Sequence, residues 1–272
     1  MKKKNRAFLK WAGGKYSLIE EINSRLPRGK KLIEPFVGAG SVFLNTNFDR
    51  YLLNDVNPDL IALYNIVKRR PVTFVKDAKR LFVPKNNDKT HYYGLRDEFN
   101  KSEDPYYRSL LFLYLNRHGF NGLCRYNLSG IFNVPFGSYN KPYFPEEEIF
   151  FFSQKAKKAK FVCEDFRKTF ARARKGDVIY CDPPYAPLTD TANFTSYAIG
   201  GFDANSQTEL MLKSERAAFK RDIPVLISNH DTPLTRKLYD NAECSFVNVS
   251  RTISQDAENR KKVSEIFASY QK

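Results

Sequence analysis

The chain has 272 residues, of which 42% are hydrophobic, so it can bury a sizeable core as one large domain or as a core with an inserted one. Its 45 Lys and Arg outnumber its 30 Asp and Glu, and the formal net charge of +15 indicates either a polyanionic partner or a basic, solvated surface. Four cysteines without CxxC spacing and only three histidines exclude a recognisable metal-ligand cluster and favour reduced thiols.

Membrane and export signals are also missing from the sequence. No apolar run approaches the roughly 20 residues that a membrane span needs, and the basic start MKKKNRAFLKW lacks the apolar core of a signal peptide. We therefore expect a cytoplasmic protein, and nothing in the sequence indicates an obligate protein partner or a membrane.

The first part of the chain alternates between strand and helix patterns. Residues 31–34 form a short apolar run before Pro35, and residues 36–44 predict a glycine turn followed by a helix. Residues 50–56 predict a second strand, and Asn57-Pro58 predicts the start of a helix through Val67. This order is typical of the first half of a Rossmann-like α/β unit.

The pattern changes after Arg70. Up to Pro145 it predicts helices, as in residues 105–115, followed by a polar, aromatic and glycine-punctuated loop or hairpin. Strands are then predicted over residues 160–163, 177–181, 224–228, 245–249 and 265–270, and a helix over residues 207–221. We predict an α/β fold in which residues 1–57 and 146–272 form the main domain and residues 58–145 a mainly helical insertion with a β-hairpin.

The glycine turn suggests a nucleoside ligand. Gly38-Ala-Gly40 lies between a strand and a helix, where bare backbone N–H groups can approach a ligand. A plain structural turn explains such a pair about as well, and Phe43 replaces the third glycine of a dinucleotide fingerprint. Asp55, at the end of the next predicted strand, can accept hydrogen bonds from ribose hydroxyls. The combination favours a nucleoside-bearing cofactor without a pyrophosphate.

The motif Asp182-Pro-Pro-Tyr185 follows the apolar run 178–181. Its simplest explanation is a strand stopped by prolines, with Asp182 capping a turn. Chemically, the Asp182 carboxylate and the Pro183 carbonyl are adjacent acceptors that suit one NH₂ group, and Tyr185 can stack on a planar base. An amine held in this way presents its lone pair to an electrophile fixed in line, without a metal. The sulfonium methyl of S-adenosylmethionine fits, and its adenosine matches Asp55.

The stretch 105–145 contains no Asp or Glu over 41 residues. Because phosphate repels carboxylates, this stretch with Arg108, Arg117, Arg125 and Lys141 predicts a surface that faces a nucleic-acid backbone. Asparagines that can read base edges alternate there with aromatic rings that can wedge between bases. These residues are Asn116, Asn121, Asn127, Asn133 and Asn140, with Phe120, Tyr126, Phe132, Phe136 and Tyr139. An exposed loop over buried aromatic rings is the alternative.

Several motifs together resemble the alpha group of DNA amino-methyltransferases, and within it the GATC-specific adenine methyltransferases. They are Phe8–Lys15, Glu34–Gly40, Asn116–Asn127, Phe132–Gly137, Asp182–Tyr185 and Ile227–His230. The resemblance covers nearly the whole chain. It implies a Rossmann-like methyltransferase fold, S-adenosylmethionine as cofactor, no metal, double-stranded DNA as partner, and N6-methylation of an adenine flipped out of GATC.

The resemblance also implies a role for each matching residue. Phe120 would enter the DNA double helix beside the flipped adenine, and Asn121 would contact the orphaned thymine. Leu123 and Pro135 would contact a thymine methyl, Arg125 would read a guanine, and Lys10 would read the outer base pair. Phosphates would be held by Arg96, Arg117, Asn127, Asn133 and Lys141. The cofactor would be bound by Trp11, Lys15, Phe36, Gly38, Gly40, Asp55, Asp165, Phe166 and Asp182, with Asp182, Pro183 and Tyr185 as the catalytic corner.

Two stretches depart from the family pattern. His118-Gly-Phe120 stands where Tyr-Gly-Tyr is usual, so the ring is kept but a hydroxyl is lost. Ser138 replaces an arginine often present after the Phe-Gly pair, and this replacement puts flanking-sequence preference and processivity in doubt, but GATC reading less so. His230 is expected to be a hydrogen-bonded structural residue, and Cys181 a core residue. Other functions stay open: RNA adenine or cytosine-N4 methylation, a catalytically silent DNA-binding regulator, and, least favoured, a nicotinamide-dependent oxidoreductase. The biological role could be repair, replication timing, gene regulation or defence.

Overall fold

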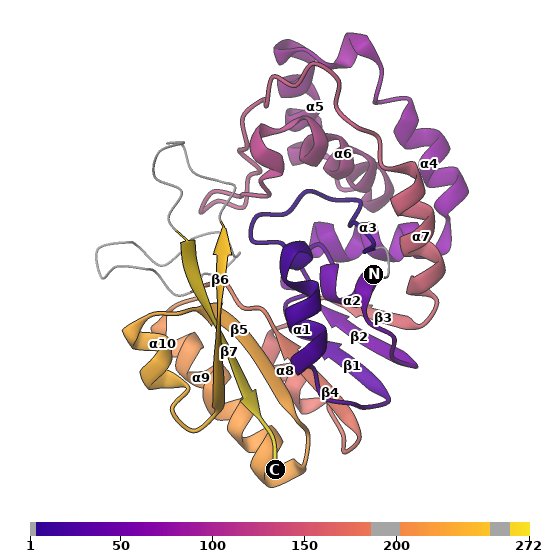
Figure 1. Ribbon diagram of the computed structural model, residues 1–272. Helices are drawn as coiled ribbons and strands as arrows, with labels where there is room; N and C mark the ends of the chain where they lie inside the picture. The colour runs from indigo at the N-terminus through magenta and orange to yellow at the C-terminus, as the bar shows by residue number, and fades with distance from the viewer. Residues whose placement is uncertain (1–3, 186–201, 251–261) are drawn as a thin grey trace. The chain divides into compact units, whose positions relative to one another are not determined.

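The computed structural model describes residues 4–185, 202–250 and 262–272 (Figure 1). The chain has a mixed α/β fold with a seven-stranded sheet, which confirms the predicted fold class. It divides into two compact units, residues 1–24 with 37–164 and residues 25–36 with 165–272. Within these described ranges, no helix has both the length and the apolar character needed to cross a membrane.

The first unit contains two strands and most of the helices. Strand β2 (Arg50–Asn54) pairs in parallel with β3 (Ala159–Val162). The helical segments are η1 (Lys15–Leu18), α1 (Ile19–Arg25, ending at the boundary of the unit), α2 (Ser41–Asn45), α3 (Pro58–Arg69), α4 (Pro71–Lys79), η2 (Pro84–Asn86), α5 (Lys89–Lys101), α6 (Pro105–His118), η3 (Phe120–Gly122) and α7 (Glu146–Ala156). Helix α3 packs against α4, α6 and α7, and α6 packs against α5 (Figure 1).

Local sequence explains where α3 begins. The Asn57 side chain accepts hydrogen bonds from the backbone N–H groups of Asp59 and Leu60, and Pro58 supplies a first-turn residue whose missing N–H costs nothing there. The helix α6 begins in the same way, with the Asp104 carboxylate accepting from the N–H of its first turn. Both starts agree with the sequence prediction.

An aromatic core holds these helices on the strands. The ring of Phe152 on α7 lies 5.0 Å from that of Phe8, 4.7 Å from that of Tyr64 and 5.7 Å from that of Phe161. All four side chains are buried. Burial of each such ring contributes about 1.5–3 kcal/mol, so this cluster is a main source of stability for the first unit.

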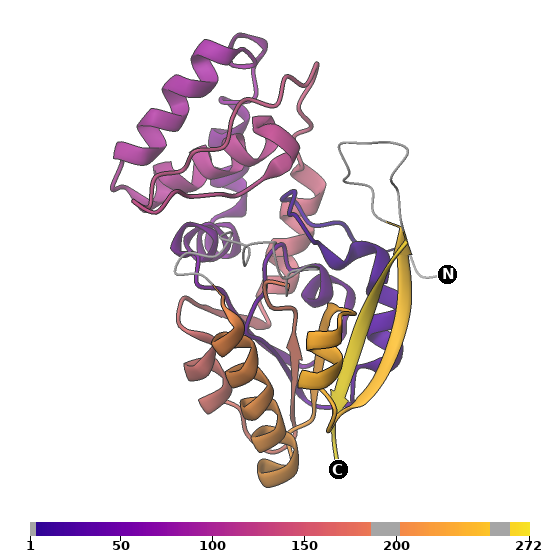
Figure 2. The same ribbon diagram turned by 90° about the vertical axis from the view of Figure 1, so that its left-hand side faces the viewer.

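The second unit contains the other five strands in the order β1-β4-β5-β7-β6. Their bounds are β1 (Lys31–Glu34), β4 (Asp177–Cys181), β5 (Val225–His230), β6 (Glu243–Ser250) and β7 (Lys262–Tyr270), and the helical segments are α8 (Phe166–Ala171), α9 (Ala204–Glu215), the π-helical turn η4 (Arg216–Lys220) and α10 (Pro233–Leu238). Strands β1, β4 and β5 are parallel, whereas β7 runs antiparallel between β5 and β6. Figure 2 shows β6 and β7 as two long neighbouring strands.

The strand order agrees with a Rossmann-like pattern in each unit by itself. The pair β3-β2 and the run β1-β4-β5 each match consecutive parts of the order 3-2-1-4-5-6. The helix predicted over residues 207–221 is divided into α9 and the π-helical turn. The boundaries of the inserted domain, at residues 58 and 145, stay a prediction.

The segment after α6 is less regular than a continuous hairpin. Two isolated antiparallel bridges, Gly119 with Phe136 and Tyr126 with Phe132, replace a ladder of strands. Pro135 has no N–H to donate to such a ladder, and Asn121 has a left-handed φ of 52°. The backbone therefore runs in a hairpin-like path without forming two strands.

Candidate functional site

The glycine turn before α2 holds an anchored carboxylate. Gly38 and Gly40 have φ values of +47° and +76°, a region that glycine occupies at little cost. Asp55 accepts hydrogen bonds from the backbone N–H of Gly38 at Oδ2 (3.1 Å) and from that of Asn57 at Oδ1 (3.0 Å). Burial raises the pKa of Asp55, and these backbone N–H groups oppose that rise. The carboxylate is therefore held in a defined orientation at the turn.

The surroundings of this turn fit a nucleoside. Each carboxylate oxygen has two lone pairs, so an oxygen of Asp55 that accepts one backbone N–H can also accept a ribose hydroxyl. The indole of Trp11 lies against Gly38, where an added Cβ would be 2.9 Å from Nε1. A cavity of about 260 Å³ is lined by residues including Trp11, Gly14 and Ala39. Lys15 is buried, and its Nζ donates to the Gly13 carbonyl at 2.9 Å.

The loop after α6 is attached to the N-terminal segment through Asn116. The Asn116 Oδ1 accepts from the backbone N–H of Lys10 (2.9 Å), and its Nδ2 donates to the carbonyls of Lys10 (2.8 Å) and Gly122 (3.0 Å). Gly122 has a φ of +63°, and an added Cβ would lie 2.2 Å from the Lys10 Cβ. The Lys10 ammonium lies 3.8 Å from the centroid of the Tyr139 ring. Burial and the nearby Arg117 lower the pKa of Lys10.

Phe120 and Asn121 form an exposed turn in this loop. The Phe120 side chain is 42% exposed, and its backbone N–H donates to the Pro135 carbonyl at 2.9 Å. Asn121 is also exposed, and its N–H donates to the Tyr139 hydroxyl at 2.9 Å. The backbone is thus fixed while both side chains are accessible to a partner.

Arg125 is held by the opposite side of the same loop. Its Nε donates to the Asn133 Oδ1 at 2.8 Å, and its Nη2 donates to the Asn133 carbonyl at 3.3 Å. Asn127 Oδ1 accepts from the N–H groups of Ser129 (3.0 Å) and Ile131 (2.9 Å) and so organises the turn between them. Two asparagines predicted to contact phosphates, Asn127 and Asn133, therefore also shape the loop.

Of the two residues predicted to contact a thymine methyl, Leu123 is half-buried and Pro135 is exposed.

The cations predicted to bind phosphate differ in their exposure. Lys141 is exposed, whereas Arg96 is half-buried and donates to the Val134 carbonyl at 3.2 Å. Arg117 is only 7% exposed, and its Nε and Nη2 donate to the Phe8 carbonyl at 3.1 and 2.7 Å. Burial lowers the pKa of the Arg117 guanidinium.

Arg108 corrects one interpretation of the acid-free stretch. Composition grouped it with cations that face a nucleic-acid backbone, but it is half-buried and forms an ion pair with Asp59 at 2.8 Å. Its partner lies in the first turn of α3, 49 positions earlier. A window restricted to residues 105–145 could not reveal that the charge of Arg108 is neutralised.

In the second unit, the Asp-Pro-Pro-Tyr corner follows the end of β4. Ser228 on β5 donates to the Asp182 Oδ1 at 3.3 Å, and its hydroxyl also shares a hydrogen bond of 2.9 Å with the Tyr180 hydroxyl. The Gln207 amide donates to the Pro184 carbonyl at 2.8 Å. These bonds orient the carboxylate and attach the proline pair to α9.

The ring of Tyr185 is also held in place. Its hydroxyl donates to the Glu265 Oε2 at 2.8 Å, and its ring lies edge-on to the His230 ring with centroids 4.3 Å apart. Burial, followed by the nearby Asp182 carboxylate, raises the pKa of Tyr185 well above its usual value. His230 is nearly buried, and Cys181 is fully buried; both observations agree with the structural roles expected for these residues.

Three aromatic rings of the second unit form a cluster. Phe36 lies 5.5 Å from Phe166 and 5.5 Å from Phe202, and Phe166 lies 5.7 Å from Phe202. Asp165 caps α8 by accepting from the Arg167 N–H at 2.8 Å, and it also forms an ion pair with the Arg167 side chain. The sequence indicated Phe36, Asp165 and Phe166 but missed Phe202.

Comparison with known proteins assigns the family. Residues 11–254 match the D12 class of N6 adenine-specific DNA methyltransferases. The chain is 59% identical over 266 residues to a DNA adenine methylase of Vibrio cholerae, covering 98% of this chain and 96% of that one. It is 58% identical over 268 residues to the DNA adenine methylases of Serratia marcescens and Escherichia coli, with 98% of this chain and 99% or 96% of theirs covered. The chain belongs to the D12 class.

This D12-class methyltransferase is therefore an adenine-specific DNA methyltransferase. In the part of the chain that the structure describes, no group of three or more His, Cys, Asp or Glu side chains could hold a metal ion. The sequence grouped Asn116 with asparagines that can read base edges, but it is 2% exposed and its side chain holds the loop instead. Sequence reasoning missed Gln207, Ser228 and Glu265, which hold the Asp-Pro-Pro-Tyr corner. Ser228 lies inside a motif that carries the resemblance, whereas Gln207 and Glu265 do not.

Proposed function

We propose that this methyltransferase transfers the methyl group of S-adenosylmethionine to N6 of an adenine flipped out of duplex GATC, in the cytoplasm. The observation that carries the proposal is the exposed Phe120–Asn121 turn, held by backbone hydrogen bonds beside Arg125. An exposed ring on a fixed backbone can replace a base in the stack, which lowers the cost of flipping, itself a few kcal/mol.

The cofactor supplies an activated methyl group when it is bound. Asp55 would accept the ribose hydroxyls at the glycine turn. The backbone N–H groups of Gly38 and Asn57 each donate to one of its carboxylate oxygens and so fix the orientation of the carboxylate. The other residues proposed to bind the cofactor are Trp11, Lys15, Gly40, Phe36, Asp165, Phe166 and Asp182. The ring pair Phe36 and Phe166 offers an apolar surface that suits a purine.

The catalytic chemistry is proposed for the Asp-Pro-Pro-Tyr corner. Asp182 Oδ2 and the Pro183 carbonyl would accept the two hydrogens of the adenine amine, which favours a pyramidal nitrogen with its lone pair directed outward. Tyr185 would stack on the base, with its ring angle set by Glu265 and His230. The Asp182 carboxylate would hold the proton that the amine releases.

The loop of the first unit is proposed to read the sequence. Arg125 would donate to a guanine, Lys10 to the outer base pair, and Asn121 to the orphaned thymine, whereas Leu123 and Pro135 would contact a thymine methyl. Phosphates would be bound by Arg96, Arg117, Asn127, Asn133 and Lys141. Arg117 would use Nη1, since Nε and Nη2 donate to the Phe8 carbonyl.

The proposal is tested by mapping the methylated sites. A long duplex is incubated with enzyme and S-adenosylmethionine and then digested with nucleases that distinguish methylated from unmethylated GATC. We expect protection at GATC sites, and N6-methyladenine as the product in nucleoside analysis. Protection spread over other sequences would refute GATC specificity. N4-methylcytosine, or faster transfer to RNA of the same sequence, would favour the alternative substrates.

A further inference from the structure

The start of α3 contacts both Asp55, which is bound to the glycine turn, and the loop proposed to read DNA. Asn57 donates its backbone N–H to Asp55 (3.0 Å) and its side-chain Nδ2 to the Cys124 Sγ (3.4 Å). Two residues further on, Asp59 Oδ2 accepts from the Tyr126 hydroxyl at 2.6 Å. Cys124 and Tyr126 are the two neighbours of Arg125. The reader of the guanine is therefore tethered on both sides to the start of one helix.

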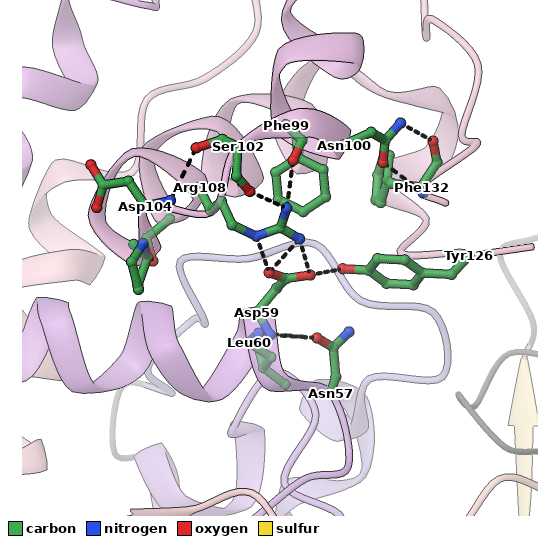
Figure 3. A network of polar contacts seen from close by, with 12 residues as sticks. Asn57, Asp59, Leu60, Phe99, Asn100, Ser102, Asp104, Arg108, Tyr126 and Phe132 are labelled. Carbon is green, nitrogen blue, oxygen red and sulfur yellow. Dashed lines mark hydrogen bonds and ion pairs between the residues drawn. The ribbon is translucent and has the colours of Figure 1, made fainter. Parts of the chain in front are cut away.

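Asp59 is a rigid acceptor (Figure 3). Arg108 donates to it from Nε (2.9 Å) and Nη2 (3.0 Å). The remaining nitrogen of Arg108 donates to the carbonyls of Phe99 (2.5 Å) and Ser102 (2.9 Å), and the guanidinium lies 4.2 Å from the centroid of the Phe99 ring. Because Arg108 is bound on all sides, Asp59 cannot move without breaking several charged hydrogen bonds. The Tyr126 hydroxyl is thus bound to a fixed point.

The Tyr126 hydroxyl and the Cys124 thiol, which form the two tethers, both stay protonated near neutral pH. Burial, followed by the nearby Cys124 and Asp59, raises the pKa of Tyr126 well above its usual value, so its hydroxyl remains a donor. Burial, followed by the Asp55 and Asp59 carboxylates, likewise raises the pKa of Cys124, so the thiol remains neutral. Both tethers therefore act as constant positional constraints.

We propose that Asn57 and Asp59 are positioning residues that set the specificity of the reaction and couple the two binding events. This inference rests on the proposed function, in which Asp55 binds the cofactor ribose and Arg125 reads a guanine. Asp59 holds Arg125 in register through Tyr126, and Asn57 joins Cys124 to Asp55. Because the start of one helix holds both groups, the arrangement that presents Asp55 to the cofactor is the one that keeps Arg125 in register. Cofactor binding then favours DNA binding, and DNA binding must favour the cofactor by the same factor.

The test removes the hydrogen bond between Tyr126 and Asp59 and keeps the aromatic ring at position 126. Tyr126→Phe deletes the hydroxyl that donates to Asp59 but keeps the ring contact with Phe132, at 5.5 Å. The matched control is Tyr106→Phe, which deletes a hydroxyl that donates to Asp77 at 2.9 Å. Both variants lose one tyrosine–carboxylate hydrogen bond in the first unit, but Tyr106 has no bond to the reading loop among the described residues.

Two ratios are measured for each protein. The first is kcat/KM for GATC divided by kcat/KM for a duplex with the guanine pair replaced. The second is the Kd of the GATC duplex without S-adenosylhomocysteine divided by the Kd with it. Loss of a hydrogen bond to a charged group predicts that Tyr126→Phe lowers the first ratio about tenfold, and loss of the coupling brings the second ratio down towards one. Tyr106→Phe should keep both ratios at the wild-type value, and thermal melting should show similar destabilisation of the two variants.

A second variant removes the link between Asn57 and Cys124 and keeps the backbone N–H of residue 57 that donates to Asp55. Asn57→Ser retains an oxygen that can cap α3 but lacks the N–H that reaches Cys124. We expect it to lower the second ratio more than the first. A wild-type second ratio of one, unchanged ratios in Tyr126→Phe, or equal losses in Tyr106→Phe would each overturn the inference. If the enzyme methylates a sequence other than GATC, the proposed function fails instead, and the same ratios measured on that sequence still decide the positioning role.

Discussion

Acidification is expected to destabilise the first unit through His118. This side chain is 1% exposed, and its ring stacks on that of Tyr114 with centroids 3.9 Å apart. Its Nδ1 is hydrogen-bonded to the Tyr114 carbonyl at 2.9 Å. Burial, with a smaller effect of the Lys10 charge, lowers the pKa of His118 to about 4. The folded enzyme therefore holds a neutral imidazole just before Gly119 and Phe120.

The difference between the pKa of His118 in the folded and unfolded chain sets the size of its effect on the free energy of unfolding. A histidine in the unfolded chain has a pKa of about 6.5, and the folded value is about 4. At about 1.4 kcal/mol for each pH unit, His118 contributes up to about 3 kcal/mol to the free energy of unfolding. Between these two pKa values the unfolded chain binds the proton and the folded chain does not. The contribution is therefore complete above pH 6.5 and is lost as the pH falls towards 4.

The assay is denaturant unfolding from pH 4 to pH 8 for the wild type and His118→Phe. Phenylalanine keeps an aromatic ring beside Tyr114 but cannot bind a proton. Carboxylates titrate in both proteins, so the difference between the two curves isolates the histidine. We expect the wild type to lose about 3 kcal/mol more than the variant between pH 6.5 and pH 4. Parallel curves would refute the assignment of a depressed pKa to His118.

Two further predictions concern the proposed site. Asp182→Ala should reduce the rate of methyl transfer by a factor of about 100 or more, because it removes an acceptor that acts on the reacting amine. The Kd for duplex DNA should stay within about twofold of the wild-type value. Near-normal turnover in a single-turnover assay would exclude this role. Arg125→Ala should weaken binding to GATC by about 1–3 kcal/mol relative to a scrambled duplex in a fluorescence titration. If both duplexes lose affinity equally, Arg125 is a phosphate contact.

Local patterns were sufficient for much of the fold. The strands were predicted to within a few residues because each contains a short apolar run, and the start of α3 follows from the Asn57-Pro58 cap. Asp55 was also proposed from local sequence, because it follows a predicted strand. The structure adds that it accepts from Asn57 and from Gly38, 17 positions earlier. The backbone path after α6 was harder to predict from the sequence, because isolated bridges do not produce the alternation of apolar and polar residues that marks a strand.

The amino-acid sequence by itself determined the family, the types of elements and the residues that carry the proposed chemistry. It could do so because motifs such as Asp182-Pro-Pro-Tyr185 are continuous in the chain. Only the tertiary structure decided which polar groups hold these motifs. Arg108 meets Asp59 across 49 positions, and Tyr185 meets Glu265 across 80. Such partners are chosen by packing and by the need to pair buried charges, and neither leaves a periodic signal in the sequence.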